Sequence, residues 1–157
     1  MIMIELKRIL FPTDFSKSSK CAQDYACALA GQFDAELHLL HVYQDVLLML
    51  PEPASAFSLP GNYMTELKAS AERALNALPD PTWAAGKRIV RITRQGSPFV
   101  EIVRYAREHD IDLIVLGTHG HSGLMHVLLG SVAEKVVRKA SCPVLTVRPE
   151  GHQFVMP

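Results

Sequence analysis

The sequence is short of cysteine, of net charge and of long apolar runs, and each shortage excludes a class of protein. Its three cysteines, Cys21, Cys27 and Cys142, are an odd number without a Cys-x2-Cys pair, which argues against a disulfide framework or a zinc knuckle and favours a reducing cytoplasm. Sixteen Lys+Arg balance sixteen Asp+Glu, whereas a nucleic-acid or anionic-membrane binder needs a basic field. The longest apolar runs, such as 46–50, are too short to span a bilayer.

The chain length predicts one domain. A chain of 157 residues buries a single core without disulfides or metal sites, and we expect that domain over 1–149, with 150–157 as a tail outside the sheet. Residues 1–12 carry Glu5 inside an apolar run and lack a small-residue cleavage signal. They therefore predict a first strand and not a signal peptide.

Short apolar runs alternate with helical patterns along the whole chain. This rhythm is typical of a parallel sheet with crossover helices, and five strands with about four helices predict an open, doubly wound α/β sheet. The expected strands are 8–12, 36–43, 88–93, 112–117 and 143–148. The expected helices run from a cap at Ser16 or Ser18 to Gly31, from about 62 to 78, from 98 to 109, and onward from 130.

The connection 44–61 is longer than an ordinary strand-to-helix loop. Connections of this length are typical of lids, mobile flaps or interaction segments. Its apolar residues could instead extend the core or form a dimer contact, and the sequence leaves both readings open.

In a doubly wound sheet, ligands bind beyond the carboxyl ends of the strands, where the strand order reverses. The exit of the fourth expected strand carries Gly117, Gly120 and Gly130, followed by Ser131 at the start of a helix. A helix amino terminus has unpaired N–H groups and partial positive charge, so it binds phosphate without a basic side chain. The glycines would let a nucleotide approach the backbone closely.

The sequence does not match either of two common phosphate-binding motifs. A P-loop needs Lys followed by Ser or Thr after its last glycine, but Gly123 is followed by Leu124. A dinucleotide fold needs Gly-x-Gly-x-x-Gly after the first strand, where FPTDFSKSS stands. A different nucleotide cradle is therefore indicated.

The spacing Gly-x2-Gly-x9-Gly-Ser, with PTDFS after the first strand and SCPVLTVR near the end, resembles the universal stress protein (UspA-like) family. The resemblance extends from Lys7 to Arg148. It implies a Rossmann-like sheet in the order 3-2-1-4-5, a homodimer formed through the last strand, and ATP binding.

The resemblance also implies a set of nucleotide-binding residues. Asp14 would contact the ribose or adenine, and the backbone of Val42 would receive the adenine edge. The remaining implied contacts line the adenosine or meet the phosphates; they are Pro12, Thr13, Leu116, Gly117, His119, Gly120, His121, Gly130, Ser131 and Val132. The expected ligand is ATP, or ADP or AMP, with Mg²⁺ or Mn²⁺ as a candidate bridge between the phosphates.

Plainer readings stand beside several of these assignments. Asp14 and Ser131 could serve only as helix caps. His119, His121 and His126 could bind a metal, but no carboxylate or cysteine lies within their loop, so no dedicated metal site is predicted. No catalytic residues are assigned, because the sequence shows no paired carboxylates at a strand exit and no base for water.

The leading hypothesis is a cytoplasmic ATP-binding stress protein with a nucleotide-dependent sensing or regulatory role. Two alternatives remain: a slow ATPase or autophosphorylating protein using Ser131 or a neighbouring hydroxyl, and an interaction module with a vestigial pocket. Fold alone does not choose between them.

Overall fold

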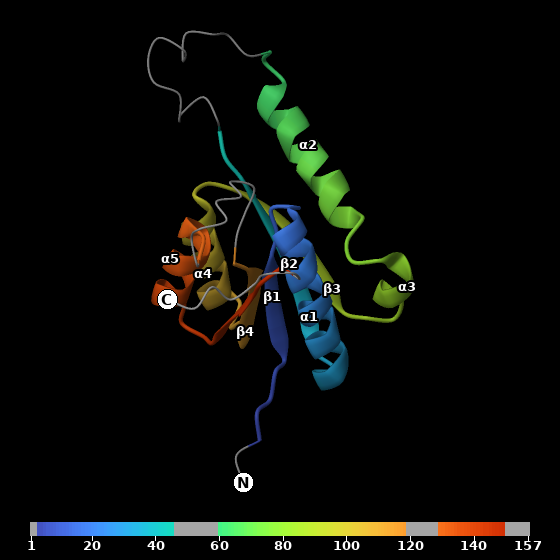
Figure 1. Ribbon diagram of the computed structural model, residues 1–157. Helices are drawn as coiled ribbons and strands as arrows, with labels where there is room; N and C mark the ends of the chain where they lie inside the picture. Colours follow the sequence, from blue (N-terminus) through green and yellow to red (C-terminus); the bar gives the residue numbers. More distant parts are fainter. Residues whose placement is uncertain (1–2, 46–59, 119–128, 150–157) are drawn as a thin grey trace.

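A computed structural model of the protein describes residues 3–45, 60–118 and 129–149. These residues form a five-stranded parallel sheet in the order β3-β2-β1-β4-β5 (Figure 1), which confirms the predicted doubly wound α/β fold. The strands are β1 (Arg8–Pro12), β2 (Glu36–Tyr43), β3 (Ile89–Gln95), β4 (Leu113–Gly117) and β5 (Val144–Val147).

Five helices occur in the described part of the chain, where about four were expected: α1 (Lys17–Phe33), α2 (Tyr63–Asn76), α3 (Pro81–Ala84), α4 (Pro98–Glu108) and α5 (Ser131–Lys139). The additional one is the short α3. Pro81 is its first residue, a position where the missing N–H of proline costs nothing. Asp80 caps that turn by accepting from the Thr82 N–H at 2.8 Å.

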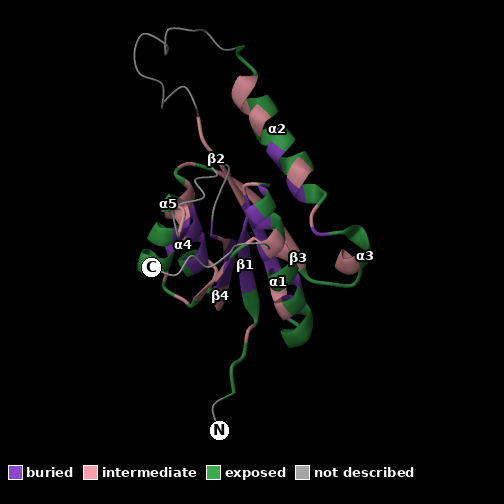
Figure 2. Ribbon diagram, in the orientation of Figure 1, coloured by how far each residue is buried: buried purple, intermediate pink, exposed green. Residues whose placement is uncertain are grey.

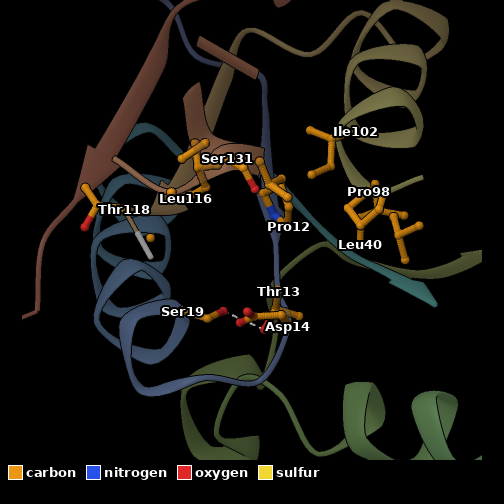
Figure 3. A pocket seen from close by; sticks show the side chains of 15 residues that line it. Pro12, Thr13, Asp14, Ser19, Leu40, Pro98, Ile102, Leu116, Thr118 and Ser131 are labelled. Atoms are coloured by element: carbon orange, nitrogen blue, oxygen red, sulfur yellow. Dashed lines mark hydrogen bonds between the residues drawn. The ribbon is translucent and has the colours of Figure 1, made fainter. Parts of the chain in front are cut away.

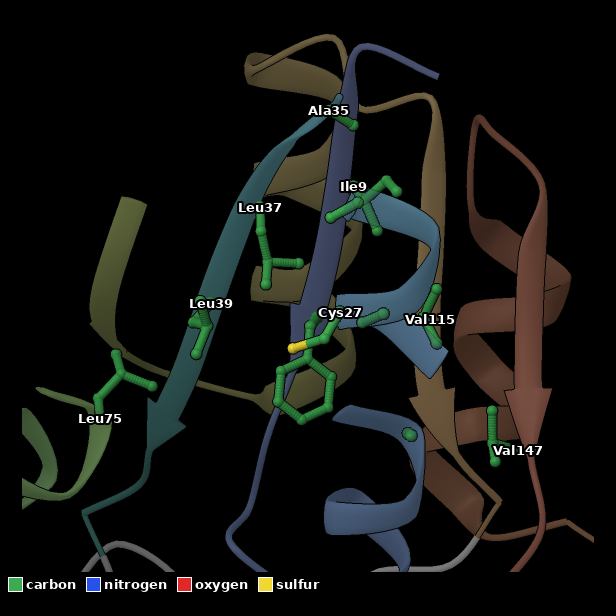
Figure 4. Packing of buried hydrophobic residues seen from close by; sticks show 12 residues of the cluster. Ile9, Cys27, Ala35, Leu37, Leu39, Leu75, Val115 and Val147 are labelled. Atoms are coloured by element: carbon green, nitrogen blue, oxygen red, sulfur yellow. The ribbon is translucent and has the colours of Figure 1, made fainter. Parts of the chain in front are cut away.

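The helices cover the sheet in two layers. Successive residues of a strand point to opposite faces. Ile9 and Phe11 of β1 therefore lie in the core cluster that includes residues of α1 and α2, and Leu10 lies in the cluster that includes residues of α4 and α5. All three side chains are fully buried. Figure 2 shows the buried residues concentrated in the central strands, and Figure 4 shows Phe11's cluster, in which Cys27 of α1 lies beside the strands.

Helix α1 begins where one of the two expected caps stands and continues past its expected end. Ser16 is the cap, because its hydroxyl accepts from the Ser19 N–H at 3.2 Å. Gly31 does not end the helix, which continues to Phe33; Asp34 ends it in the left-handed conformation with φ of 51°. No helix in the described ranges is long and apolar enough to cross a membrane.

Candidate functional site

A cavity of about 260 Å³ lies at the carboxyl ends of β1 and β4. Its wall contains all of the predicted nucleotide-contact residues that the structure describes (Figure 3), namely Pro12, Thr13, Asp14, Val42, Leu116, Gly117, Gly130, Ser131 and Val132. Three further predicted contacts, His119, Gly120 and His121, lie outside the described residues. The fold therefore brings together residues from four separate parts of the sequence.

Strand β2 supplies one wall of the cavity because it outlasts its neighbour. Its ladder with β1 ends at Leu40, whose carbonyl accepts from the Thr13 N–H at 2.9 Å. On the other side, the Tyr43 carbonyl accepts from the Gly96 N–H at 3.1 Å. Backbone groups alternate in direction along a strand, so the N–H and C=O of Val42 point toward β1, beyond its last residue. This is the geometry that a flat ligand edge needs.

The turn between β1 and α1 presents Asp14 to the cavity. The Thr13 hydroxyl lies 2.6 Å from the Ser19 hydroxyl, and one Asp14 carboxylate oxygen accepts from the Ser16 N–H at 3.0 Å. Asp14 is therefore not the cap of α1, a role that belongs to Ser16. Asp14 is half-buried, and the bond of its carboxylate to the Ser16 N–H stabilises the turn that carries it.

Gly117 is required by the packing of the protein itself. A Cβ added there would lie 2.6 Å from the Ser18 hydroxyl oxygen and 2.8 Å from the Ser18 carbonyl carbon and oxygen. Helix α1 thus passes so close to the end of β4 that no side chain fits. The sequence assigned this glycine to ligand approach, whereas the structure shows a close approach between two elements of the fold.

The amino terminus of α5 opens onto the cavity. Gly130 is the N-cap, with φ of −65° and extended backbone, and its N–H donates to the Thr118 carbonyl at 2.6 Å. Ser131 is the first helical residue and therefore not the cap. The N–H groups of Ser131, Val132 and Ala133 occupy first-turn positions that have no partner within a helix, and all three residues line the cavity.

Sequence reasoning missed several wall residues: Ser19, Leu40, Pro98, Ile102, Thr118 and Ala133. Pro98 and Ile102 are four apart in α4 and so lie on one helix face, a spacing visible in the sequence. Their position beside the cavity was not, because it depends on how α4 crosses the sheet. With Ser19 in α1 and Pro98 in α4, the first turns of three helices line this cavity.

The wall combines two chemical characters. Leu40, Val42, Ile102 and Leu116 supply an apolar side, and the hydroxyls of Thr13, Ser19 and Ser131 supply a polar one. Helix amino termini carry partial positive charge, so three of them favour an anion even though the wall has no Lys or Arg among the described residues. Within the described part of the chain, no group of three or more His, Cys, Asp or Glu could hold a metal ion.

Comparison with known protein families shows to which family the chain belongs. A family described as the universal stress protein family matches residues 5–148. The chain belongs to the universal stress protein family. A relative, universal stress protein MJ0531 of Methanocaldococcus jannaschii, is 38% identical over 143 residues, covering 90% of this chain and 82% of the relative.

Solved universal stress protein structures share the fold. The structure of MJ0577 from Methanocaldococcus jannaschii has a TM-score of 0.79 at 30% identity and covers 94% of this chain and 99% of that chain. A universal stress protein in complex with cAMP has a TM-score of 0.69 at 27% identity, covering 94% of this chain and 100% of that chain. At this similarity, this universal stress protein shares its overall fold with these solved structures.

Proposed function

We propose that this universal stress protein binds an adenine nucleotide in the cavity beside β1 and β4, with ATP as the expected ligand, and that the bound nucleotide controls a regulatory role in the stress response. The observation that carries the proposal is the convergence on one cavity of every described residue of the predicted set. A structural relative bound to cAMP supports an adenine ligand.

The adenosine would lie against the apolar side of the cavity. The N–H and C=O of Val42 point past the end of β1 and can pair with the donor and acceptor atoms of an adenine edge. The Asp14 carboxylate accepts hydrogen bonds from ribose hydroxyls, and Leu116 supplies apolar surface nearby. This end of the cavity thus recognises a neutral, hydrogen-bonding group.

The phosphates would lie at the first turn of α5. The N–H groups of Ser131, Val132 and Ala133, which have no partner within the helix, can bind phosphate oxygens without a cationic side chain. A bound Mg²⁺ or Mn²⁺ would neutralise phosphate charge and would be held by the phosphate oxygens together with the Ser131 hydroxyl. The ligand's orientation follows, because an anion is repelled by the Asp14 carboxylate and attracted by α5.

Gly130→Val tests the site. Gly130 lines the cavity, and its φ of −65° is one that any residue adopts, so a valine adds bulk at the cavity wall without requiring a positive φ. We expect calorimetric titration with ATP and Mg²⁺ to show saturable binding in nucleotide-stripped wild-type protein and none in Gly130→Val. Gly61→Val is the control, because a Cβ added at Gly61 meets nothing within 4 Å. Equal affinity of both variants and the wild type would contradict the proposed site.

A second function, slow ATP hydrolysis or autophosphorylation, is favoured by the position of Ser131. Ser131 lines the cavity at the first turn of α5, where the terminal phosphate is expected. Radiolabelled phosphate from ATP should then appear on the protein and be absent from Ser131→Ala. Turnover no faster than in buffer, with no labelled protein, would contradict this second function.

We also propose a homodimer formed through β5. This strand lies at the edge of the sheet, and the Pro143 and Val147 carbonyls face β4, where they accept from Ile114 and Thr118. By alternation, the backbone groups of Val144 and Thr146 point outward, where a second β5 can pair with them, whereas those of Leu145 face β4. Sedimentation at micromolar concentration should show a dimer, and a monomer would contradict this assembly.

A further inference from the structure

The hydrogen-bond ladder between β1 and β2 ends before β2 does. The Thr13 N–H still pairs with Leu40, and continuation of the parallel pattern would bring the Val42 N–H to the Thr13 carbonyl. That carbonyl instead accepts from a side chain: His41 Nδ1 lies 2.8 Å from it. A carbonyl oxygen can only accept, so Nδ1 carries a proton. The imidazole of His41 thus takes the position of the next ladder bond.

Phe15 holds the imidazole in this position. The ring centroids of Phe15 and His41 are 4.5 Å apart. The Phe15 backbone is left-handed, with φ of 64°, a conformation that is unfavourable for a residue with a Cβ and persists only where surrounding contacts enforce it. Those contacts are the His41 ring and the Thr13 hydroxyl, which accepts from the Phe15 N–H at 3.0 Å.

The two halves of the proposed adenosine contact depend on this arrangement. The Thr13 carbonyl, once bound by His41, leaves the Val42 N–H facing the cavity. The left-handed Phe15 turns the chain so that Asp14 faces the same cavity. Neither Phe15 nor His41 lines the wall itself, so any effect of these two residues on a ligand passes through their neighbours.

We propose that His41 is a positioning residue that ends the β1–β2 ladder at Thr13 and thereby keeps the Val42 N–H available to an adenine edge. The inference rests on the proposed nucleotide site. It assigns to His41 a function separate from any contact with ligand: the imidazole competes with Val42 for one carbonyl oxygen.

Two substitutions at position 41 separate the donor from the ring. His41→Phe keeps an aromatic ring beside Phe15 and removes the N–H. His41→Asn removes the ring and keeps a donor, since its amide nitrogen can occupy the position of Nδ1. His109→Phe is the matched control: His109 also pairs Nδ1 with a backbone carbonyl, that of Tyr105 at 3.0 Å, and stacks on the Tyr105 ring, but at the opposite end of α4 from the cavity.

The first measurement is hydrogen exchange of the Val42 amide in ligand-free protein, followed by NMR. In His41→Phe the Thr13 carbonyl becomes available, so the Val42 N–H should pair with it and exchange more slowly than in the wild type. Simple loosening of the turn would change exchange in the opposite direction. Unchanged or faster exchange of the Val42 amide in His41→Phe would overturn the inference.

The second measurement is adenine nucleotide affinity by calorimetry. We expect His41→Phe to bind about fivefold more weakly, the effect of one net hydrogen bond, and His41→Asn and His109→Phe to bind as the wild type does. Equal affinity of His41→Phe and wild type would overturn the positioning role. Wild-type protein that binds no adenine nucleotide would overturn the proposed function, while the exchange experiment would still report whether His41 ends the ladder.

Discussion

Gly117→Ala and Gly31→Ala introduce the same methyl group with opposite expected effects on stability. At Gly117 the new Cβ would lie 2.6–2.8 Å from Ser18, and two of the three contacts are with backbone atoms that cannot rotate away. Forcing extra atoms into a packed site costs about 1–3 kcal/mol. At Gly31, within α1, the added Cβ meets nothing within 4 Å, and alanine in a helix is more stable than glycine by about 0.5–1 kcal/mol.

Urea unfolding of the two variants beside the wild type measures both effects. For a chain of this length each 1 kcal/mol moves the melting temperature by about 2–4 °C, so thermal unfolding should show the same two directions. Ser18→Ala, added to Gly117→Ala, should restore only part of the loss, because the contacts with the Ser18 carbonyl remain. Wild-type stability of Gly117→Ala, or its full recovery by Ser18→Ala, would refute the argument that the backbones of β4 and α1 exclude a side chain.

Three further predictions concern the core and the helix cap. Burial lowers the pKa of His38 below its ordinary 6.5, so the unfolded chain binds the proton more tightly and the free energy of unfolding falls as pH drops below 6.5. Between pH 7.5 and pH 5.5, urea unfolding should show a smaller loss of stability in His38→Gln than in the wild type. Equal losses in the two proteins would contradict this. Burial raises the pKa of the Cys27 thiol to about 12, so iodoacetamide at pH 8 should modify the half-buried Cys21 first and Cys27 only in urea. Equal rates of modification of Cys21 and Cys27 in the folded protein would be inconsistent with a buried Cys27. Ser16→Ala should lose about 0.5–2 kcal/mol of stability, measured by urea unfolding, and Ser16→Thr should retain most of it; a loss shared by both variants would rule out the cap as its cause.

The arrangement of strands and helices was largely predictable because it depends on local patterns. Runs of apolar residues marked the strands to within one or two residues, and Ser16 was one of two caps proposed for α1. The helix end at Gly31 was wrong, because an exposed glycine is tolerated inside a helix and the left-handed Asp34 ends it instead. The start of α3 at Pro81 was missed, since proline both ends one helix and opens another.

Family resemblance named nine residues that the structure brings to one cavity, and their contact with a nucleotide stays a prediction. The physical reasons for their positions were not predictable. Gly117 is explained by Ser18, a residue far away in the sequence. The Val42 backbone groups lie beyond the last residue of β1 because the β1–β2 ladder ends at Leu40, and the Thr13 carbonyl that follows accepts from His41 Nδ1 at 2.8 Å. Such contacts arise from strand register and helix crossing, which no local pattern in the sequence specifies.

The central claim is that the cavity binds an adenine nucleotide. Calorimetric titration of nucleotide-stripped wild-type protein with ATP and Mg²⁺, preceded by mass spectrometry of any small molecule that co-purifies, tests it most directly. The account predicts a co-purifying adenine nucleotide, or saturable binding at one site per chain. An empty protein that shows no saturable binding at millimolar ATP, ADP or AMP would contradict it.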